Sequence, residues 1–216
     1  MFPPVEFANS DGVLCQGGHL TSWSLLAAYS QGIFPWPHKG YEMLWFAPPL
    51  RGVLFFEEIH VGSRLRRYLK NSGFEISFNR NFAEVMRACA EPRWCEGEWE
   101  EGTWISDDVL DSYGQLHEMG FAHSVECWQN GELVGGLYGV SMGLYFAGES
   151  MFHRRNNASK ACVLALVEKM SAAGAYWLDI ETLTPHFEKL GARLVPRNLF
   201  MEMHREALHT TARVFE

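Results

Sequence analysis

The clearest pattern of apolar and polar positions lies in the second half of the chain, where two-residue alternation gives way to a helical period. Asn130-Gly131 separates two alternating runs and is typical of a two-residue hairpin turn. The long helical run is expected to begin after Asn157, as its N-cap, and to end at Gly174. The pattern predicts strands over 122–128, 132–140 and 143–150, a helix over 158–173, a strand over 175–181 and a short helix within 184–192.

The first half of the chain is less regular because Gly and Pro interrupt it up to about residue 60. Gly32 and Gly73 are expected to end two helices, and Asn81 is expected to cap a third. Residues 91–102 are predicted to form a loop because they combine Pro, Gly and five Glu. The expected elements are helices over 22–31, 63–71, 82–90 and 107–120 and a strand over 52–59.

Strands in succession followed by helical crossovers predict an α+β fold, with a mixed sheet and helices packed on it. We expect a small N-terminal domain over 1–62 and a second domain over 63–216. The order of elements in the second domain resembles the core of the Gcn5-related acyltransferase fold. CoA enzymes of that fold hold the pyrophosphate with a Gly-rich turn, and the corresponding junction here, 151–157, has no glycine. The sequence therefore disfavours CoA as an acyl carrier.

Composition narrows the class of protein further. The chain has 216 residues, 47% of them hydrophobic, which is enough for a sizeable core and excludes a disordered chain. No apolar run approaches the roughly 18 residues that a membrane span needs, and the N-terminus lacks the basic start of a secretory signal. The five cysteines form no C-x-x-C pair, and His117-Glu118 is followed by Phe121 rather than a second His. We therefore expect a cytoplasmic protein without a metal site.

Charge is distributed unevenly along the chain, whose formal net charge is −8. Residues 51–93 contain eight Lys or Arg against five Asp or Glu, whereas residues 94–149 contain eleven acidic residues and no basic one. Four basic residues gather within seven positions: Arg64, Arg66, Arg67 and Lys70. A local basic cluster can hold a few phosphates, and an acidic zone can attract a cationic substrate. Solvated acidic and basic surfaces would give the same pattern.

Three carboxylates are candidates for proton transfer. Alternation along a strand places Asp179 and Glu181 on one face of the predicted strand over 175–181. Their repulsion is relieved either by a raised pKa of one of them, which would make a general base, or by solvation at a sheet edge. Glu149 shares a face with Tyr145 near the end of the predicted strand over 143–150. We expect the three to converge in a pocket that holds an amine or takes its proton.

Six segments together resemble the leucyl/phenylalanyl-tRNA–protein transferase family, and the resemblance runs from about residue 12 to residue 197. They are GIFPW (32–36), EGTWI (101–105), HSVE (123–126), ELVGGLYGV (132–140), GESMFHRRNNASK (148–160) and LDIETLTPHFEKLGA (178–192). One position in these segments departs from the family, which usually has Gln where this chain has Glu181. The family uses no CoA.

The resemblance implies an aminoacyltransferase. Members of the family move leucine, phenylalanine or, less efficiently, methionine from aminoacyl-tRNA to the α-amine of proteins that begin with Arg or Lys, which marks those proteins for N-degron proteolysis. They need no metal and no cofactor. Two alternatives remain open from the residues alone: a CoA-dependent N-acyltransferase on the same fold, and a non-catalytic module that binds tRNA or basic N-termini.

The resemblance also implies roles for individual residues. Glu149 would hold an ammonium group, Asp179 would orient and polarise position 181, and Glu181 would help to deprotonate the attacking amine. The basic cluster at 64–70 would contact the phosphates of the acceptor stem. Three aromatic residues would lie near the terminal adenosine and the reaction centre: Tyr29, Trp36 and Trp104. Four apolar residues would line the aminoacyl side-chain pocket: Leu137, Phe146, Val163 and Met170.

Overall fold

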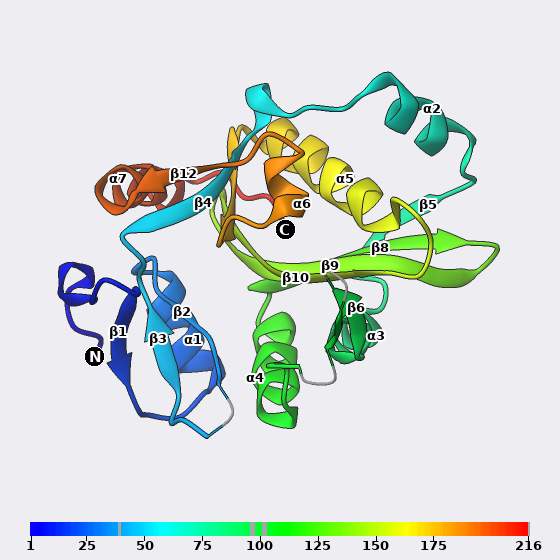
Figure 1. Ribbon diagram of the computed structural model, residues 1–216. Coiled ribbons are helices and arrows are strands. Elements are labelled where there is room, and N and C mark those ends of the chain that lie inside the picture. The colour runs from blue at the N-terminus through cyan, green and yellow to red at the C-terminus, as the bar shows by residue number, and fades with distance from the viewer. Residues whose placement is uncertain (39, 96–97, 101–102, 216) are drawn as a thin grey trace.

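The computed structural model describes residues 1–38, 40–95, 98–100 and 103–215, arranged as a small N-terminal layer beside a large sheet with helices on both faces (Figure 1). The helices are α1 (Ser22–Tyr29), α2 (Ser63–Asn71), α3 (Phe82–Ala90), α4 (Asp107–Glu118), α5 (Ala158–Ala173), α6 (Pro185–Glu188) and α7 (Arg197–Leu208), with 3₁₀ turns at Val5–Phe7 and Phe56–Glu58. The strands are β1 (Val13–Gln16), β2 (Phe34–Pro35), β3 (Leu44–Phe46), β4 (Leu50–Phe55), β5 (Glu75–Phe78), β6 (Arg93–Cys95), β7 (Glu98–Glu100), β8 (Ala122–Gln129), β9 (Glu132–Met142), β10 (Tyr145–His153), β11 (Trp177–Glu181) and β12 (Arg193–Pro196).

The large sheet is mixed, as the sequence predicts. Its seven strands run in the order β12-β4-β11-β10-β9-β8-β5. β10 and β11 are parallel because α5 connects them, and the other neighbours are antiparallel. β1, β3 and β2 form a separate sheet, which confirms a distinct N-terminal unit within an α+β fold.

Local signals in the second half of the chain form the predicted elements. Asn130 and Gly131 both have positive φ, 53° and 81°, as a tight hairpin between β8 and β9 requires. Gly174 ends α5 in the left-handed region with φ 100°. Asn157 precedes α5 as expected, but its side chain makes no capping hydrogen bond and its own φ is 64°. The prediction of the helix is therefore confirmed, whereas the expected side-chain cap is wrong.

Three features of the first half differ from the prediction. The stretch expected as a loop, 91–102, contains the paired strands β6 and β7. Its high Glu content is untypical of strands, so the sequence did not predict them. The expected strand over 52–59 begins at residue 50 and ends at residue 55, where a 3₁₀ turn follows. The pattern also did not identify the short strands β1, β2, β3, β5 and β12 or the helix α7.

The position of β4 moves the domain boundary. The expected border after residue 62 assigns β4 to the N-terminal domain, but β4 pairs with β11 and β12 inside the large sheet. The three-stranded sheet ends at Phe46, so we place the boundary near residue 49. β4 therefore belongs to the large sheet, as the second strand from its edge.

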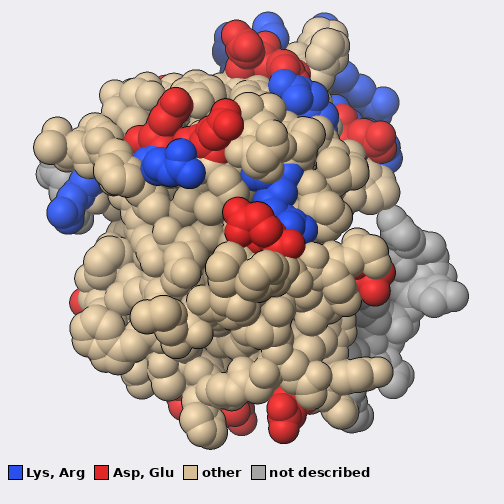
Figure 2. Space-filling view, turned by 90° about the vertical axis from the view of Figure 1, so that its left-hand side faces the viewer, with Lys and Arg blue, Asp and Glu red and all other residues tan. Residues whose placement is uncertain are grey.

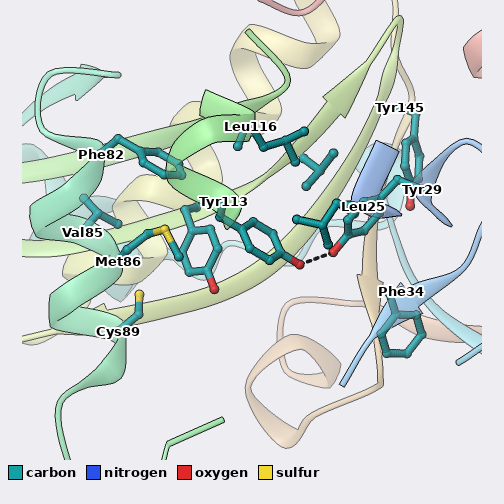
Figure 3. Close-up of a cluster of buried hydrophobic side chains, with 14 of the residues drawn as sticks. Leu25, Tyr29, Phe34, Phe82, Val85, Met86, Cys89, Tyr113, Leu116 and Tyr145 are labelled. Carbon is teal, nitrogen blue, oxygen red and sulfur yellow. Dashed lines mark hydrogen bonds between the residues drawn. The ribbon is translucent and has the colours of Figure 1, made fainter. Parts of the chain in front are cut away.

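Two apolar clusters lie on opposite faces of the large sheet. One packs α3 and α4 against the sheet and continues into the N-terminal layer through Leu25, Tyr29 and Phe34 (Figure 3). The other packs α5 against the opposite face and includes Leu178 and Ile180 of β11. Because side chains alternate along β11, Asp179 points to the first cluster, where the N-terminal layer and the sheet meet.

Candidate active site

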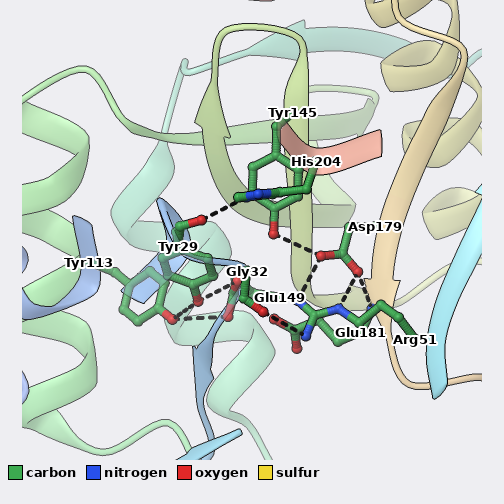
Figure 4. Close-up of polar contacts among 9 residues, drawn as sticks. All are labelled: Tyr29, Gly32, Arg51, Tyr113, Tyr145, Glu149, Asp179, Glu181 and His204. Atoms are coloured by element: carbon green, nitrogen blue, oxygen red, sulfur yellow. Dashed lines mark hydrogen bonds and ion pairs between the residues drawn. The ribbon is translucent and has the colours of Figure 1, made fainter. Parts of the chain in front are cut away.

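Asp179 of β11 is fully buried, and each of its carboxylate oxygens accepts two hydrogen bonds (Figure 4). Oδ1 accepts from Arg51 Nε at 2.9 Å and from the backbone N–H of Glu181 at 2.8 Å. Oδ2 accepts from Arg51 Nη2 at 2.7 Å and from the Tyr145 hydroxyl at 2.8 Å. A carboxylate with this many donors is fixed in place and is suited to orienting its neighbours.

Arg51 of β4 is held on both faces of its guanidinium plane. The ring centroids of Phe34 and Phe200 lie 4.4 Å and 4.7 Å from its Cζ, and its Nη1 lies 3.5 Å from the carbonyl oxygen of Gly32. Burial on its own would lower the pKa of Arg51, but the Asp179 carboxylate outweighs it and raises the pKa above its ordinary value. Arg51 is therefore a permanent cation that joins the N-terminal layer, β11 and α7.

Glu181 reaches the site because the end of β11 leaves the regular strand geometry. The register with β4 shifts between Asp179 and Glu181, and Glu181 has φ 58°, in the left-handed region. Gly52 lies opposite this bulge, where a Cβ would come within 2.9 Å of the Thr182 carbonyl carbon. The local backbone thus depends on Gly52 and on the hydrogen bond from the Glu181 N–H to Asp179.

Glu149 of β10 is bound by two tyrosines from different helices (Figure 4). Tyr29 of α1 donates to Oε1 at 2.6 Å, and Tyr113 of α4 donates to Oε2 at 2.9 Å. The two hydroxyl oxygens are themselves only 2.5 Å apart. The Glu181 side chain lies beside that of Glu149 (Figure 4), close enough for each charge to affect the pKa of the other.

Burial shifts the pKa values in this cluster. Burial raises the pKa of Glu149 to about 7, against the lowering effect of the hydrogen bonds from Tyr29 and Tyr113. Burial and the neighbouring Glu149 raise the pKa of Glu181 well above its ordinary value. Burial and the Glu149 charge likewise raise the pKa of Tyr29 and Tyr113. At neutral pH the tyrosines are therefore donors, and the Glu pair is able to exchange protons.

The structure thus brings Glu149, Asp179 and Glu181 together in one cluster. Sequence reasoning did not identify four groups that hold them: Arg51, Tyr113, Tyr145 and His204, whose Nε2 lies 2.9 Å from the carbonyl oxygen of Tyr29. Alternation along β10 places Tyr145 on the face of Glu149, and this was the only signal available for any of the four.

The four apolar residues expected in an aminoacyl pocket lie on the other face of the sheet. Leu137, Phe146, Val163 and Met170 are all buried in the cluster between the sheet and α5. They come from β9, β10 and α5, and Leu178 and Ile180, on either side of Asp179 in β11, belong to the same cluster. The structure brings the four together, but as closely packed side chains rather than as an open cavity.

The three expected aromatic residues differ in how accessible they are. Tyr29 is fully buried, so its role in the structure is the hydrogen bond to Glu149. Trp104 is half-buried against the cluster that contains Tyr113. Trp36 keeps 37% of its surface exposed and lies 5.7 Å from the ring of Phe46. It belongs to the N-terminal layer, over which the surface in Figure 2 shows few charged side chains.

The basic cluster lies on α2, at the edge of the molecule (Figure 1). Its four basic side chains are all exposed: Arg64, Arg66, Arg67 and Lys70. α2 is attached to the rest of the protein mainly through Leu69, which packs against the cluster under α5. This arrangement leaves the charged face free to meet a phosphate backbone, and the structure does not bring it into contact with the carboxylates.

Other candidate sites are not supported in the part of the chain that the structure describes. A groove of about 630 Å³ between α3 and α4 is lined by none of the predicted site residues. Within the described ranges there is no cluster of three or more His, Cys, Asp or Glu that could hold a metal ion. Among the helices described, none is long and apolar enough to cross a membrane.

Comparison with known proteins identifies the family. Residues 53–205 match the family described as leucyl/phenylalanyl-tRNA protein transferase, and residues 18–49 match its N-terminal domain. The chain is 46% identical to the leucyl/phenylalanyl-tRNA–protein transferase of Stutzerimonas stutzeri, over 93% of this chain and 88% of that protein. It is 45% identical to the corresponding protein of Azotobacter vinelandii, over 98% of this chain and 93% of that protein.

Among solved structures, a GCN5-related N-acetyltransferase-like protein from Streptococcus suis is similar with a TM-score of 0.36 and 20% identity, over 68% of this chain and 59% of that one. The sequence matches are far closer, and each of the two full-length relatives exceeds 40% identity over most of both chains. The chain belongs to the leucyl/phenylalanyl-tRNA–protein transferase family.

Proposed function

We propose that this protein transfers leucine or phenylalanine, and methionine less efficiently, from aminoacyl-tRNA to the α-amine of proteins that begin with Arg or Lys. The observation that carries the proposal is the family match over 53–205, a range that includes Glu149, Asp179 and Glu181. The products would be substrates for N-degron proteolysis. Because charged tRNA belongs to the cytoplasm, we propose that the protein acts there.

The chemistry requires one bond to form and one to break. The amine nitrogen attacks the ester carbonyl carbon, the C–N bond forms, and the bond to the ribose oxygen breaks. The amine must lose a proton, and the departing ribose oxygen must gain one. The ester arrives already activated on the tRNA, so the protein needs to supply only positioning and proton transfer.

The buried site offers groups for both tasks. Asp179, fixed by Arg51 and Tyr145, would position Glu181 through the Glu181 N–H. Glu149 and Glu181 would receive the amine of the substrate as an ammonium ion and take its proton. The raised pKa of Glu149, about 7, suits a group that must gain and lose protons near neutral pH.

The substrate would be bound by surfaces around this centre. The exposed basic residues of α2 would contact phosphates of the tRNA, and Trp36 would stack on its terminal adenosine, with Trp104 and the Tyr29 hydroxyl nearer the reaction centre. Leu137, Phe146, Val163 and Met170 would move apart to admit the amino-acid side chain. Met170 suits such a pocket because its side chain is flexible and adapts to different shapes.

The test is transfer from labelled Leu-tRNA and Phe-tRNA to four peptides that differ only in their N-terminal residue: Arg, Lys, Asp or Ala. Label on the Arg and Lys peptides alone is the expected result. Label on the Asp or Ala peptide would contradict the proposed acceptor specificity. Binding of charged tRNA with no label on any peptide would contradict the transferase activity and favour a binding module.

A further inference from the structure

The hydrogen bonds around Glu149 need more hydrogen atoms than the tyrosines provide. Tyr29 and Tyr113 each carry one hydroxyl hydrogen. Their oxygens and the Glu149 carboxylate make three close contacts, at 2.5 Å, 2.6 Å and 2.9 Å. Two hydrogens cannot serve three oxygen–oxygen contacts, since each hydrogen bond requires one.

A proton on Glu149 completes the ring of contacts. The protonated Oε2 then donates to Tyr113, Tyr113 donates to Tyr29, and Tyr29 donates to Oε1 of Glu149. Without it, one of the three contacts has no hydrogen between its two oxygens. The buried Oε1 of Glu181 has no hydrogen-bond partner, so ionising Glu181 as well would leave a charged oxygen unsatisfied.

The charges around the pair lead to the same conclusion. Arg51 is the cation of the cluster, and Asp179 already takes two of its N–H groups. These two charges cancel, so ionising both Glu149 and Glu181 would leave two partly buried negative charges side by side. The titratable groups that face the pair come from six elements: Tyr29 (α1), Arg51 (β4), Tyr113 (α4), Tyr138 (β9), Tyr145 (β10) and Asp179 (β11). His204 (α7) packs against the ring of Tyr145.

We propose that the Glu149–Glu181 pair carries one proton in the resting protein, placed on Glu149 by the ring of contacts, and that the two residues act together as the proton carrier of the transfer reaction. This rests on the proposed function. The pair first passes one proton of the substrate's ammonium group to solvent, which leaves a neutral amine. With one proton and one negative charge, the pair then takes a second proton from the amine as the C–N bond forms. It then gives a proton to the ribose oxygen as the C–O bond breaks, and returns to its starting state.

Glu181 determines how this carrier responds to pH. With two carboxyls the pair has two ionisations, and only the singly protonated form can both accept and donate a proton. A glutamine at position 181 would donate its N–H to Glu149 and favour the ionised form of that carboxyl. The Glu181→Gln variant should therefore shift the acid limb of the pH–rate profile down by about one pH unit or more. Glu149→Gln should slow transfer by about 100-fold or more at every pH.

The first measurement does not depend on activity. Infrared difference spectra of the full-length protein, wild type minus Glu181→Gln, should show the C=O band of a protonated carboxyl near neutral pH, with the shift in D₂O that such a group gives. Glu206→Gln, an exposed residue of α7, is the control and should leave this band unchanged. A wild-type spectrum without the band would overturn the shared proton, whether or not the protein is active.

The second measurement is the single-turnover transfer rate as a function of pH, for the same three proteins and Glu149→Gln. A Glu181→Gln profile that coincides with the wild-type profile would overturn the carrier role, even if the infrared band is present. If the wild type transfers nothing, the proposed function fails, and the infrared result still decides whether the proton is shared.

Discussion

Arg51 holds Asp179 by two parallel hydrogen bonds, of 2.9 Å from Nε and 2.7 Å from Nη2, at a place where both side chains are closed off from solvent. Arg51 lies in the first strand after the N-terminal layer and stacks on Phe34 of that layer. Asp179 holds the backbone of Glu181. The pair therefore connects the packing between the two domains to the geometry of the carboxylates.

The Arg51→Met variant should lose about 3–5 kcal/mol in the free energy of unfolding, because it leaves Asp179 buried without its cation. Transfer activity should fall with it, since Glu181 loses its fixed neighbour. Urea unfolding and transfer assays check the two effects. The matched control is Arg193→Met, which breaks the 3.0 Å pair with Glu58 at the surface and should cost less than about 1 kcal/mol. Equal losses in both variants would contradict the role assigned to Arg51.

Much of the catalytic domain was predictable because its strands largely alternate. Alternation from Tyr145 places Glu149 on the predicted face, although the register of β10 with β9 shifts between Gly148 and Ser150. The parallel pairing of Ala147 with Asp179 brings the strands of Glu149 and Asp179 side by side. Glu181 belongs with them for a different reason. Its position depends on a bulge and a positive φ, which no two-residue period can predict.

The groups that hold the carboxylates could not be predicted in the same way. Arg51 and Asp179 are 128 positions apart in the sequence, and Tyr113 and Glu149 come from a helix and a strand 36 positions apart. Their contacts depend on how the layers pack, so the spacing of residues in the sequence cannot predict them. The same reason explains why β4 falls before the border expected after residue 62, since nothing local shows that β4 pairs with β11 and β12, which lie far along the chain.

Neutralising one basic residue of α2 should weaken tRNA binding, because it reduces the electrostatic contribution to the affinity. If Arg67 contacts a phosphate, Arg67→Gln should lower the steepness of log K against log salt concentration by about one. Fluorescence titration of charged tRNA over a range of salt concentrations measures this slope. Arg205→Gln removes an equally exposed arginine from α7 and should leave the slope unchanged. The same slope for both variants would exclude α2 from the tRNA interface.

Trp36→Ala should weaken the binding of the tRNA 3′ end by about 1–3 kcal/mol, the usual contribution of an aromatic ring stacked on a base. Competition with a short aminoacylated acceptor-stem RNA isolates this contribution from the contacts of α2. Trp23→Ala is the matched control because Trp23 is also in the N-terminal layer and is 72% exposed. A similar loss for Trp23→Ala would indicate a general effect of the layer and not stacking at Trp36.

Met170→Ala should change which amino acid the protein transfers. Shortening this fully buried side chain enlarges the space among the four pocket residues. The ratio of the phenylalanine transfer rate to the leucine transfer rate should therefore rise by about 10-fold or more. The measurement is the ratio of the two single-turnover rates. Met86→Ala makes the same truncation in the other apolar cluster. Both variants should lose about 2–5 kcal/mol of stability, but only Met170→Ala should change the ratio.

The Glu149–Glu181 pair should also make the free energy of unfolding depend on pH. Burial raises the pKa of Glu149 to about 7, above the ordinary value of 4.5 that applies in the unfolded chain. Between these two values the folded state holds a proton that the unfolded state has released, so this contribution to stability is complete below about pH 4.5 and is lost as pH rises through 7. One such proton corresponds to about 1.4 kcal/mol for each pH unit.

Other groups also change protonation in this pH window, since burial lowers the pKa of His204 to about 4 and the contribution of His204 to stability falls as pH drops. The effect is therefore isolated by the difference between variants. In urea unfolding the stability of Glu181→Gln relative to wild type should rise steadily with pH through this window, whereas Glu206→Gln should follow the wild type. A difference that does not change with pH would show that the two carboxyls ionise independently of folding.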